Sequence, residues 1–209
     1  EPEDWFFSRQ AHELGLKMGA TRKVQLLHWG EYAFDNQEPF GQYEFDREAF
    51  EVSPVPGAFP YDIPGWLKPE DGKLLSELAR GKTVLEIGSY CGLSTVCMAR
   101  TAKHVTACDY FDGRGTPSMK DTLPAFTDSM RRHGITNVVT AHPDSPLPLD
   151  QYDMVFIDGA HDRDSVARDI DKALSVLSPE GAMVFHDYGE AAHPGVADAV
   201  NELLANGGE

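Results

Sequence analysis

Short apolar runs alternate with amphipathic segments along the chain from residue 69 onward. The apolar runs predict strands over 83–88, 104–109, 137–141, 153–158 and 182–187. The segments between and around them carry apolar residues at helical spacing and predict helices over 69–80, 93–102, 123–133, 163–177 and 194–205. Pro179 and Gly181 follow the fourth of these helices and are expected to end it. Strands separated by helices predict an α/β protein with a doubly wound, mainly parallel sheet.

The first 67 residues have a different pattern. Residues 3–18 predict a helix, whereas the stretch 24–66 is rich in aromatic residues and is interrupted by five prolines. This density of proline argues against long regular elements. We therefore divide the chain into an N-terminal helix with an aromatic and proline-rich cap, 1–67, and a main domain, 68–209. The aromatic rings either supply a substrate pocket or a subunit contact, or pack on the main domain.

The overall charge narrows the range of partners. The 209-residue chain has a formal net charge of −16 at pH 7, which disfavours nucleic acid and anionic membrane surfaces as partners. The sequence has no run of 18 apolar residues and no signal-peptide pattern, so we expect a cytoplasmic protein. Cys91, Cys97 and Cys108 lack CxxC spacing and are expected to be reduced and structural.

The first predicted strand leads into a glycine turn with the pattern E-x-G-x-x-x-G, formed by Glu86, Gly88 and Gly92. A strand, a glycine turn and a helix start allow the backbone to approach a nucleotide-like ligand closely. The dinucleotide fingerprint GxGxxG is absent, because Tyr90 stands where its second glycine would be. An NAD-dependent oxidoreductase is therefore the weakest of the enzyme hypotheses.

The stretch 86–95, E-I-G-S-Y-C-G-L-S-T, resembles the first motif of class I S-adenosylmethionine (SAM) dependent methyltransferases. It resembles in particular the branch of metal-dependent small-molecule O-methyltransferases, of the methyltransferase-24 type. The resemblance covers residues 68–205 and implies a Rossmann-like sheet with strand order 3-2-1-4-5, with SAM as the cofactor. It implies that SAM is bound by Glu86, Gly88, Ser89, Tyr90, Gly92 and Ser94.

The sheet edge departs from the family pattern. Members of the family usually have two further strands after the last helix, whereas here only Gly207, Gly208 and Glu209 follow it. Further edge strands therefore stay unassigned. Segments 24–27 and 31–34, from this chain or a neighbouring one, are candidates to fill the edge.

Acidic residues follow the second and third predicted strands. Asp109 lies 23 positions beyond Glu86, where a carboxylate can accept both hydrogen bonds of a ribose diol, and the resemblance implies this role in SAM binding. Asp144 lies in a segment that resembles the border of the adenine site. Either acid can instead be an ordinary turn residue.

The fourth and fifth strands each end at an acid that has a histidine nearby: Asp158 with His161, and Asp187 with His186. Two carboxylates at one rim repel each other unless they share a cation or a proton, and Mg²⁺ would remove that repulsion. The resemblance implies that Asp158 and Asp187 bind the metal, with His186 where members often have another acid or an amide. Imidazole suits Mg²⁺ less well and favours Mn²⁺ or Fe²⁺. Without a metal, both acids would cap loops or bind the amino group of SAM.

His161 is the candidate general base, because O-methylation requires the acceptor hydroxyl to lose a proton and a histidine can take it. The alternatives are that His161 caps the following helix or lies behind the residues that bind the metal. Asp158 beside it is assigned to the catalytic group as well as to SAM and metal binding. His12, His28 and His193 are expected to be ordinary surface or packing residues.

The sequence thus predicts a SAM-dependent methyltransferase that methylates a hydroxyl of a small molecule, a sugar or a natural product, with Mg²⁺ or another divalent metal. A metal-independent N- or C-methyltransferase and a SAM-binding module without methyl transfer are the alternatives. No nucleic-acid or membrane partner is expected. The aromatic cap and the unfilled sheet edge are compatible with a homodimer.

Overall fold

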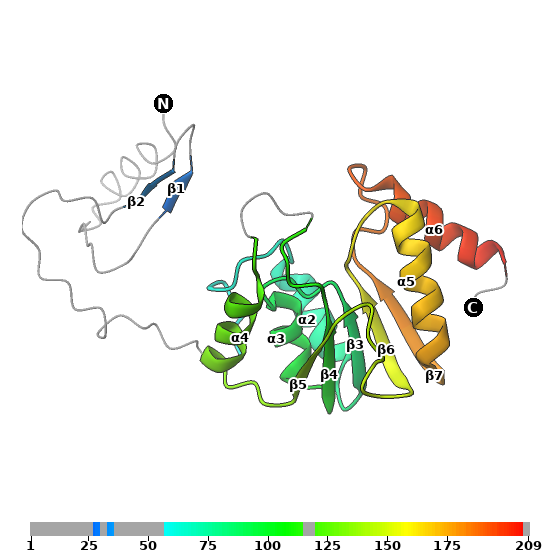
Figure 1. Ribbon diagram of the computed structural model, residues 1–209, viewed down its shortest axis with the longest axis horizontal. Coiled ribbons are helices and arrows are strands. Elements are labelled where there is room, and N and C mark those ends of the chain that lie inside the picture. The colour runs from blue at the N-terminus through cyan, green and yellow to red at the C-terminus, as the bar shows by residue number, and fades with distance from the viewer. Residues whose placement is uncertain (1–26, 30–32, 36–56, 115–119, 207–209) are drawn as a thin grey trace, which may run out of the picture. The chain divides into compact units, whose positions relative to one another are not determined.

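The computed structural model describes residues 57–114 and 120–206, together with the backbone of two short strands, 27–29 and 33–35 (Figure 1). The chain divides into two compact units, Glu1–Ser53 and Pro54–Glu209. The helix predicted over 3–18 and most of the aromatic residues of 24–56 lie outside the described residues. None of the helices in the described ranges is long and apolar enough to cross a membrane.

In the first unit, strand β1 (Leu27–Trp29) pairs antiparallel with β2 (Ala33–Asp35), with Leu27 opposite Asp35. These strands form a sheet of their own. The candidate edge segments 24–27 and 31–34 overlap these strands at Leu27 and at Ala33 and Phe34, and these positions pair within the small sheet.

The second unit is built around a five-stranded parallel sheet. Its strands are β3 (Thr83–Ile87), β4 (His104–Cys108), β5 (Val138–Ala141), β6 (Tyr152–Ile157) and β7 (Leu177–Phe185). Their order is β5-β4-β3-β6-β7, which confirms the predicted 3-2-1-4-5 arrangement. The helices are α2 (Pro69–Leu78), α3 (Leu93–Ala99), α4 (Leu123–Arg132), α5 (Arg163–Val176) and α6 (Pro194–Ala205).

The helices cover both faces of this sheet, with α2, α3 and α4 on one side and α5 and α6 on the other (Figure 1). Successive strand residues point to opposite faces, so β3 serves both layers. Leu85 and Ile87 pack in one core cluster with residues of α5 and α6. Val84 packs in another with residues of α2 and α3. The doubly wound architecture predicted from the alternating pattern is confirmed.

The fifth strand begins earlier than the sequence predicted. Strand β7 starts at Leu177, directly after α5, so Pro179 and Gly181 lie within the strand and not in a loop after the helix. Because β7 is at the end of the strand order, Pro179 can occupy it without breaking a central hydrogen-bond ladder. The pairing with β6 shifts register between Tyr152 and Met154, which accommodates the irregular segment. The strand ends at Phe185 and leaves His186 and Asp187 beyond its carboxyl end.

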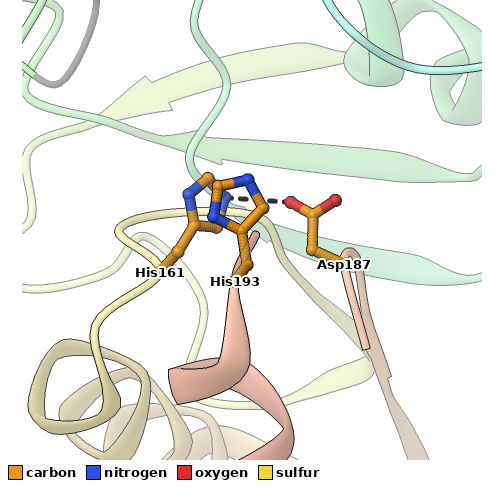
Figure 2. Close-up of side chains that lie close together, drawn as sticks. All are labelled: His161, Asp187 and His193. Atoms are coloured by element: carbon orange, nitrogen blue, oxygen red, sulfur yellow. Dashed lines mark ion pairs between the residues drawn. The ribbon is translucent and has the colours of Figure 1, made fainter. Parts of the chain in front are cut away.

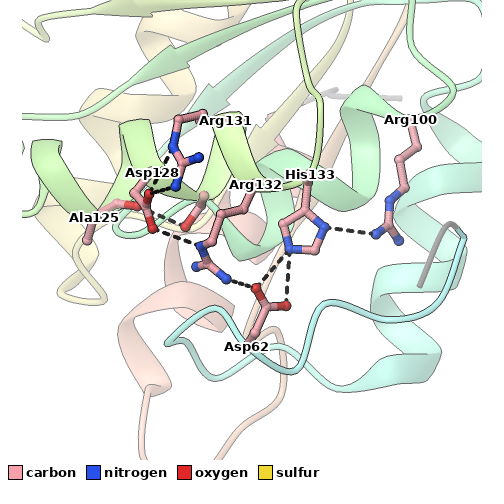
Figure 3. A network of polar contacts seen from close by, with 8 residues as sticks. Asp62, Arg100, Ala125, Asp128, Arg131, Arg132 and His133 are labelled. Carbon is pink, nitrogen blue, oxygen red and sulfur yellow. Dashed lines mark hydrogen bonds and ion pairs between the residues drawn. The ribbon is translucent and has the colours of Figure 1, made fainter. Parts of the chain in front are cut away.

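A polar network attaches the segment 57–67 to the end of α4 (Figure 3). Asp62 pairs with Arg132, and both of its carboxylate oxygens lie 3.1 Å from Nε2 of His133. Nδ1 of His133 lies 3.3 Å from the guanidinium of Arg100 on the other side. The side chain of Ile63 in the same segment is buried in the core between α3 and α4. These contacts explain why the segment clusters with the second unit, whereas the sequence analysis set the boundary after residue 67.

Candidate active site

A cavity of about 640 Å³ opens at the carboxyl ends of the central strands, the usual ligand position in an open α/β sheet. The residues that follow β3, β4 and β6 form much of its wall. They include Gly88, Ser89, Tyr90, Asp109, Tyr110, Asp158 and His161. Residues 64–67 line it as well, so part of the stretch that the sequence analysis assigned to the cap contributes to the cavity.

Asp109 holds the loop that follows β3. Its Oδ2 accepts hydrogen bonds from the backbone N–H groups of Ser89 (2.7 Å) and Tyr90 (2.9 Å). Its Oδ1 accepts one from the N–H of Phe111 (2.7 Å). A carboxylate offers about four acceptor positions, so these three bonds leave roughly one for a ligand. The residue expected to bind the ribose therefore lies in the cavity wall and also fixes the shape of the loop.

Three non-glycine residues near the carboxyl ends of strands have left-handed backbone conformations. They are Tyr90 (φ 46°), Phe111 (φ 54°) and Asp187 (φ 58°). Each such residue costs roughly 1–3 kcal/mol and persists only where surrounding contacts hold it in place. Asp109 provides two of those contacts, to Tyr90 and Phe111. Backbone strain is thus concentrated at the rim where the candidate residues lie.

Glu86 lies beneath the loop and does not line the cavity. It is fully buried and accepts hydrogen bonds from the hydroxyls of Ser94 and Thr95 at the start of α3. Burial raises its pKa to about 7. Glu86 therefore stabilises the turn from within, while Ser94 is the member of this group that lines the cavity.

Two further predicted SAM-binding residues also lie away from the cavity wall. Gly92 packs under α4, where a Cβ would lie 2.6 Å from Met130 and 3.0 Å from Phe126. The side chain of Asp144 is 74% exposed, and its neighbour Pro143 lines the cavity in its place. The turn after β5 thus directs Asp144 to solvent.

The four residues predicted at the ends of the fourth and fifth strands meet in one cluster. Nε2 of His161 lies 3.0 Å from Oδ2 of Asp187 and 4.0 Å from Oδ1 of Asp158. Nδ1 of His186 lies 3.1 Å from the same Asp187 oxygen and 3.3 Å from Oδ1 of Asp158. Parallel pairing of β6 with β7 brings these four side chains together.

The acids and histidines of this cluster shift one another's pKa values. The neighbouring carboxylates, Asp158 first, raise the pKa of His186 to about 9 and also raise the pKa of His161. Burial alone would raise the pKa of Asp158, but its interactions with His161 and His186 hold that pKa below the ordinary value. The two imidazoles and the Asp158 carboxylate therefore favour one another's charged forms.

The donor atoms of this cluster also fit a divalent cation. Asp158, His186 and Asp187 each offer one ligand atom, and these atoms all lie within 4.8 Å of one another. Nε2 of His161 and Nδ1 of His186 are buried, and neither makes a well-oriented hydrogen bond to any residue of the described ranges. Buried nitrogens that converge on carboxylates without such bonds are what a shared metal ion requires.

Some residues of the site were not identified from the sequence. Arg168, Asp169 and Lys172 of α5 line the cavity, and their three- and four-residue spacing places them on one helix face. Burial raises the pKa of Asp169 to about 6, and the Lys172 ammonium donates to the carbonyl oxygen of Pro143 (2.6 Å). The spacing could have indicated these residues, but the other charged residues of this amphipathic helix show similar spacings.

His193 was expected to be an ordinary surface or packing residue, and the structure places it against the candidate general base. Its ring stacks on the ring of His161, with centroids 4.0 Å apart and planes at 34° (Figure 2). It comes from the residue before α6, far along the chain from the glycine turn. Nothing in the local sequence pattern identifies it, because the contact arises from how α6 packs.

Comparisons with known proteins agree with this architecture. A family model described as "Methyltransferase domain" matches residues 85–188, a range that contains Asp109, Asp158, His161, His186 and Asp187 but not His193. A search of curated proteins finds no match.

Similar solved structures include three methyltransferases. A precorrin-6y C5,15-methyltransferase from Geobacter metallireducens is 20% identical with a TM-score of 0.57, covering 74% of this chain and 81% of its own. The O-methyltransferase TomG from Streptomyces achromogenes, involved in tomaymycin synthesis and solved with SAM, is 21% identical with a TM-score of 0.53 (69% and 73% covered). An O-methyltransferase from Bacillus cereus, solved with S-adenosylhomocysteine (SAH), is 17% identical with a TM-score of 0.52 (69% and 73% covered). At these identities the likeness shows a shared fold.

Proposed function

The chain belongs to the class I SAM-dependent methyltransferases, and we propose that it transfers the methyl group of SAM to a hydroxyl group of a small molecule. The observation that carries this proposal is that Asp158 and His161, two members of the cluster of acids and histidines, line the cavity. The loop held by Asp109 forms another part of the same cavity wall. A cofactor bound at that loop would present its methyl group toward His161 and Asp158.

The loop after β3 would bind the cofactor. Gly88 lets the backbone pass close to Asp158, and Ser89 and Tyr90 line the cavity. Asp109 keeps about one acceptor position for a ribose hydroxyl. Asp158 is positioned to interact with the amino group of SAM as well as with the histidines. TomG and the Bacillus cereus enzyme, which share this fold, were solved with SAM and SAH respectively.

His161 would act as the general base. The methyl group moves by displacement at the sulfonium centre, so the attacking oxygen must lose its proton during the reaction. His161 lines the cavity, and its imidazole can accept this proton when it is neutral. Asp187, 3.0 Å away, would stabilise the imidazolium that forms. Holding the acceptor in line with the methyl–sulfur bond would supply much of the remaining rate enhancement.

A divalent ion would be held by Asp158, His186 and Asp187, whose ligand atoms already lie together. When bound, such an ion lowers the pKa of a hydroxyl that it contacts. The imidazole of His186 favours Mn²⁺ or Fe²⁺ over Mg²⁺, which prefers an all-oxygen environment.

A metal-independent methyltransferase acting on nitrogen or carbon is the second candidate, and the electrostatics of the cluster favour it. The raised pKa values of His161 and His186 allow two imidazolium groups to neutralise Asp158 and Asp187. In that case the cluster would only position the substrates. Loss of activity on chelation separates the two mechanisms.

The acceptor would bind near an aromatic pair. Trp66 is 70% exposed and lies over Tyr90, with ring centroids 5.4 Å apart and planes at 33°. Both residues line the cavity. Exposed rings at a ligand site bind the flat faces of aromatic compounds or sugars. This supports a catechol-like or sugar hydroxyl as the acceptor.

Labelled SAM tests the proposal directly. The full-length protein is incubated with panels of catechols, sugars and amines, with Mg²⁺ or Mn²⁺ and again after EDTA. Transfer to a hydroxyl that is lost on chelation supports the metal-assisted O-methyltransferase. Transfer to nitrogen or carbon that survives EDTA supports the second candidate, and cofactor binding without any transfer supports a binding module.

A further inference from the structure

Two side chains of the cluster described above, His161 and Asp187, also meet a third one, His193. His161 precedes α5, Asp187 follows β7, and His193 precedes α6 (Figure 2). Each offers one ligand atom, and the three atoms all lie within 4.8 Å of one another. The set shares Asp187 with the Asp158–His186–Asp187 cluster but has a different composition, with two imidazoles and one carboxylate.

The packing of α6 holds His193 in this position. A Cβ at Gly195 would lie 2.6 Å from the carbonyl oxygen of His161 and 2.5 Å from the backbone nitrogen of Arg163. The first turn of α6 therefore packs directly on the backbone that carries His161. The N–H of His193 donates to the carbonyl oxygen of Glu190 (3.0 Å), and its carbonyl accepts from the N–H of Val196 (3.2 Å). Its backbone is thus fixed on both sides.

The imidazole of His193 is not used by the helix that it precedes. His193 is the N-cap of α6, yet its side chain makes no capping hydrogen bond. The adjacent Nε2 of His161 is buried and makes no well-oriented hydrogen bond within the described ranges. The imidazole of His193 and Nε2 of His161 can therefore bind a metal ion beside the Asp187 carboxylate.

We propose that His161, Asp187 and His193 form a binding site for a transition-metal ion such as Zn²⁺. Two histidines and one carboxylate, with a fourth position left to water, are a common ligand set for zinc in proteins. Nitrogen donors bind borderline ions of this kind in preference to Mg²⁺. With two imidazoles against one, this site would thus favour Zn²⁺ more strongly than the more acidic Asp158–His186–Asp187 cluster.

Occupation of this site has a consequence for activity that rests on the proposed function. One oxygen of Asp187 lies 3.0 Å from His161 and 3.1 Å from His186, so it serves both sets. A zinc ion would engage Nε2 of His161, the nitrogen proposed as the base. Zn²⁺ would therefore inhibit methyl transfer, while an ion bound by Asp158 and His186 would support it.

Calorimetric titration of Zn²⁺ into the EDTA-stripped full-length protein, without SAM or acceptor, tests the site independently of methyl transfer. The variant His193→Ser removes the imidazole but keeps a residue that caps helices well. We expect it to weaken Zn²⁺ binding at least about tenfold. Asp187→Asn should weaken binding as strongly.

The matched control is His142→Ser. His142 is an exposed histidine with its own carboxylate neighbour, Asp144, at 3.8 Å, and it belongs to neither set of ligands found in the described ranges. Its removal should leave Zn²⁺ affinity unchanged. Equal losses in the His142 and His193 variants would show adventitious binding to surface histidines and overturn the proposal. Wild-type affinity in His193→Ser would overturn it as well.

A measurement on the wild-type protein covers the case in which His193→Ser fails to fold. One equivalent of Zn²⁺ should shift the imidazole proton resonances of His161 and His193 together, with His142 unaffected. A shift of His161 and His186 without His193 would place the ion in the other cluster and contradict the proposal.

Discussion

The backbone of Gly88 passes so close to Asp158 that a Cβ at position 88 would lie 2.1 Å from the Asp158 carbonyl oxygen. This approach joins the glycine turn after β3 to the acid at the end of β6. Gly88 also has a left-handed conformation, with φ of 89°. The loop proposed to bind the cofactor and the cluster proposed to carry the chemistry are therefore in direct backbone contact.

Gly88→Ala should destabilise the protein by at least about 3 kcal/mol, because it combines left-handed strain with a backbone clash. It should also weaken SAH binding, since the turn must move away from Asp158. Gly81→Ala is the matched control, because Gly81 has φ of 71° and no atom of the described residues beyond its chain neighbours lies within 4 Å of its Cβ position. That variant should lose only about 1–2 kcal/mol. Urea unfolding of both variants makes the comparison, and equal losses would show that the contact with Asp158 is unimportant.

The buried carboxyl of Glu86 predicts a specific dependence of stability on pH. Its pKa is raised from 4.5 to about 7, so the folded protein keeps this proton while the unfolded chain releases it. The contribution of this group is full below pH 4.5 and is lost as the pH rises to about 7. The loss is about 3 kcal/mol as an upper estimate. Glu86→Gln should flatten this part of the curve of unfolding free energy against pH, and an unchanged slope would argue that Glu86 is ionised in the fold.

Asp109→Asn should weaken both the loop and cofactor binding. The asparagine amide group would replace one acceptor oxygen with an N–H donor that faces backbone N–H groups. Because two donors cannot form a hydrogen bond, the loop should lose roughly 1–3 kcal/mol of stability. We expect SAH affinity to fall at least about tenfold, as judged from that energy. Asp164→Asn, an exposed acid in the first turn of α5, is the control and should leave affinity unchanged. Wild-type affinity in Asp109→Asn would remove this residue from the cofactor site.

His161→Ala should lower kcat by about 10²–10⁴, the usual contribution of a general base, while SAH binding is retained. His104→Ala is the control, because His104 is the first residue of β4 and lies at the end of the strand away from the cavity. This variant should leave kcat unaltered. Steady-state rates with the identified acceptor, together with calorimetry of SAH binding, separate the two effects. A His161 variant that turns over normally would assign proton transfer to another group.

The positions of the four cluster residues could be predicted because they depend only on strand ends. Apolar runs located β6 and β7, and parallel pairing brings their carboxyl ends to one rim. Asp158, His161, His186 and Asp187 then meet without any knowledge of loop structure. The strand order followed from the resemblance of the glycine turn to a known family.

The positions of Glu86, Asp144 and His193 depend on features that a motif does not contain. Glu86 lies on the same face of β3 as Val84 and is directed into the helix layer. The alternation of side chains along a strand could have predicted this direction. Asp144 follows a turn whose direction is set by tertiary packing. His193 reaches His161 only because Gly195 allows α6 to pack against residues 161–163. No periodicity in the sequence reports such a contact.

Calorimetric titration of the full-length protein with SAH, with Mg²⁺ and again after EDTA, tests the central claim most directly. A SAM-dependent methyltransferase with its cofactor in this cavity should bind SAH with a dissociation constant on the order of micromolar. Asp109→Asn should weaken that binding, and chelation should abolish turnover with the identified acceptor. Absence of binding by the wild-type protein under both conditions would contradict the account and leave the cavity without its proposed ligand.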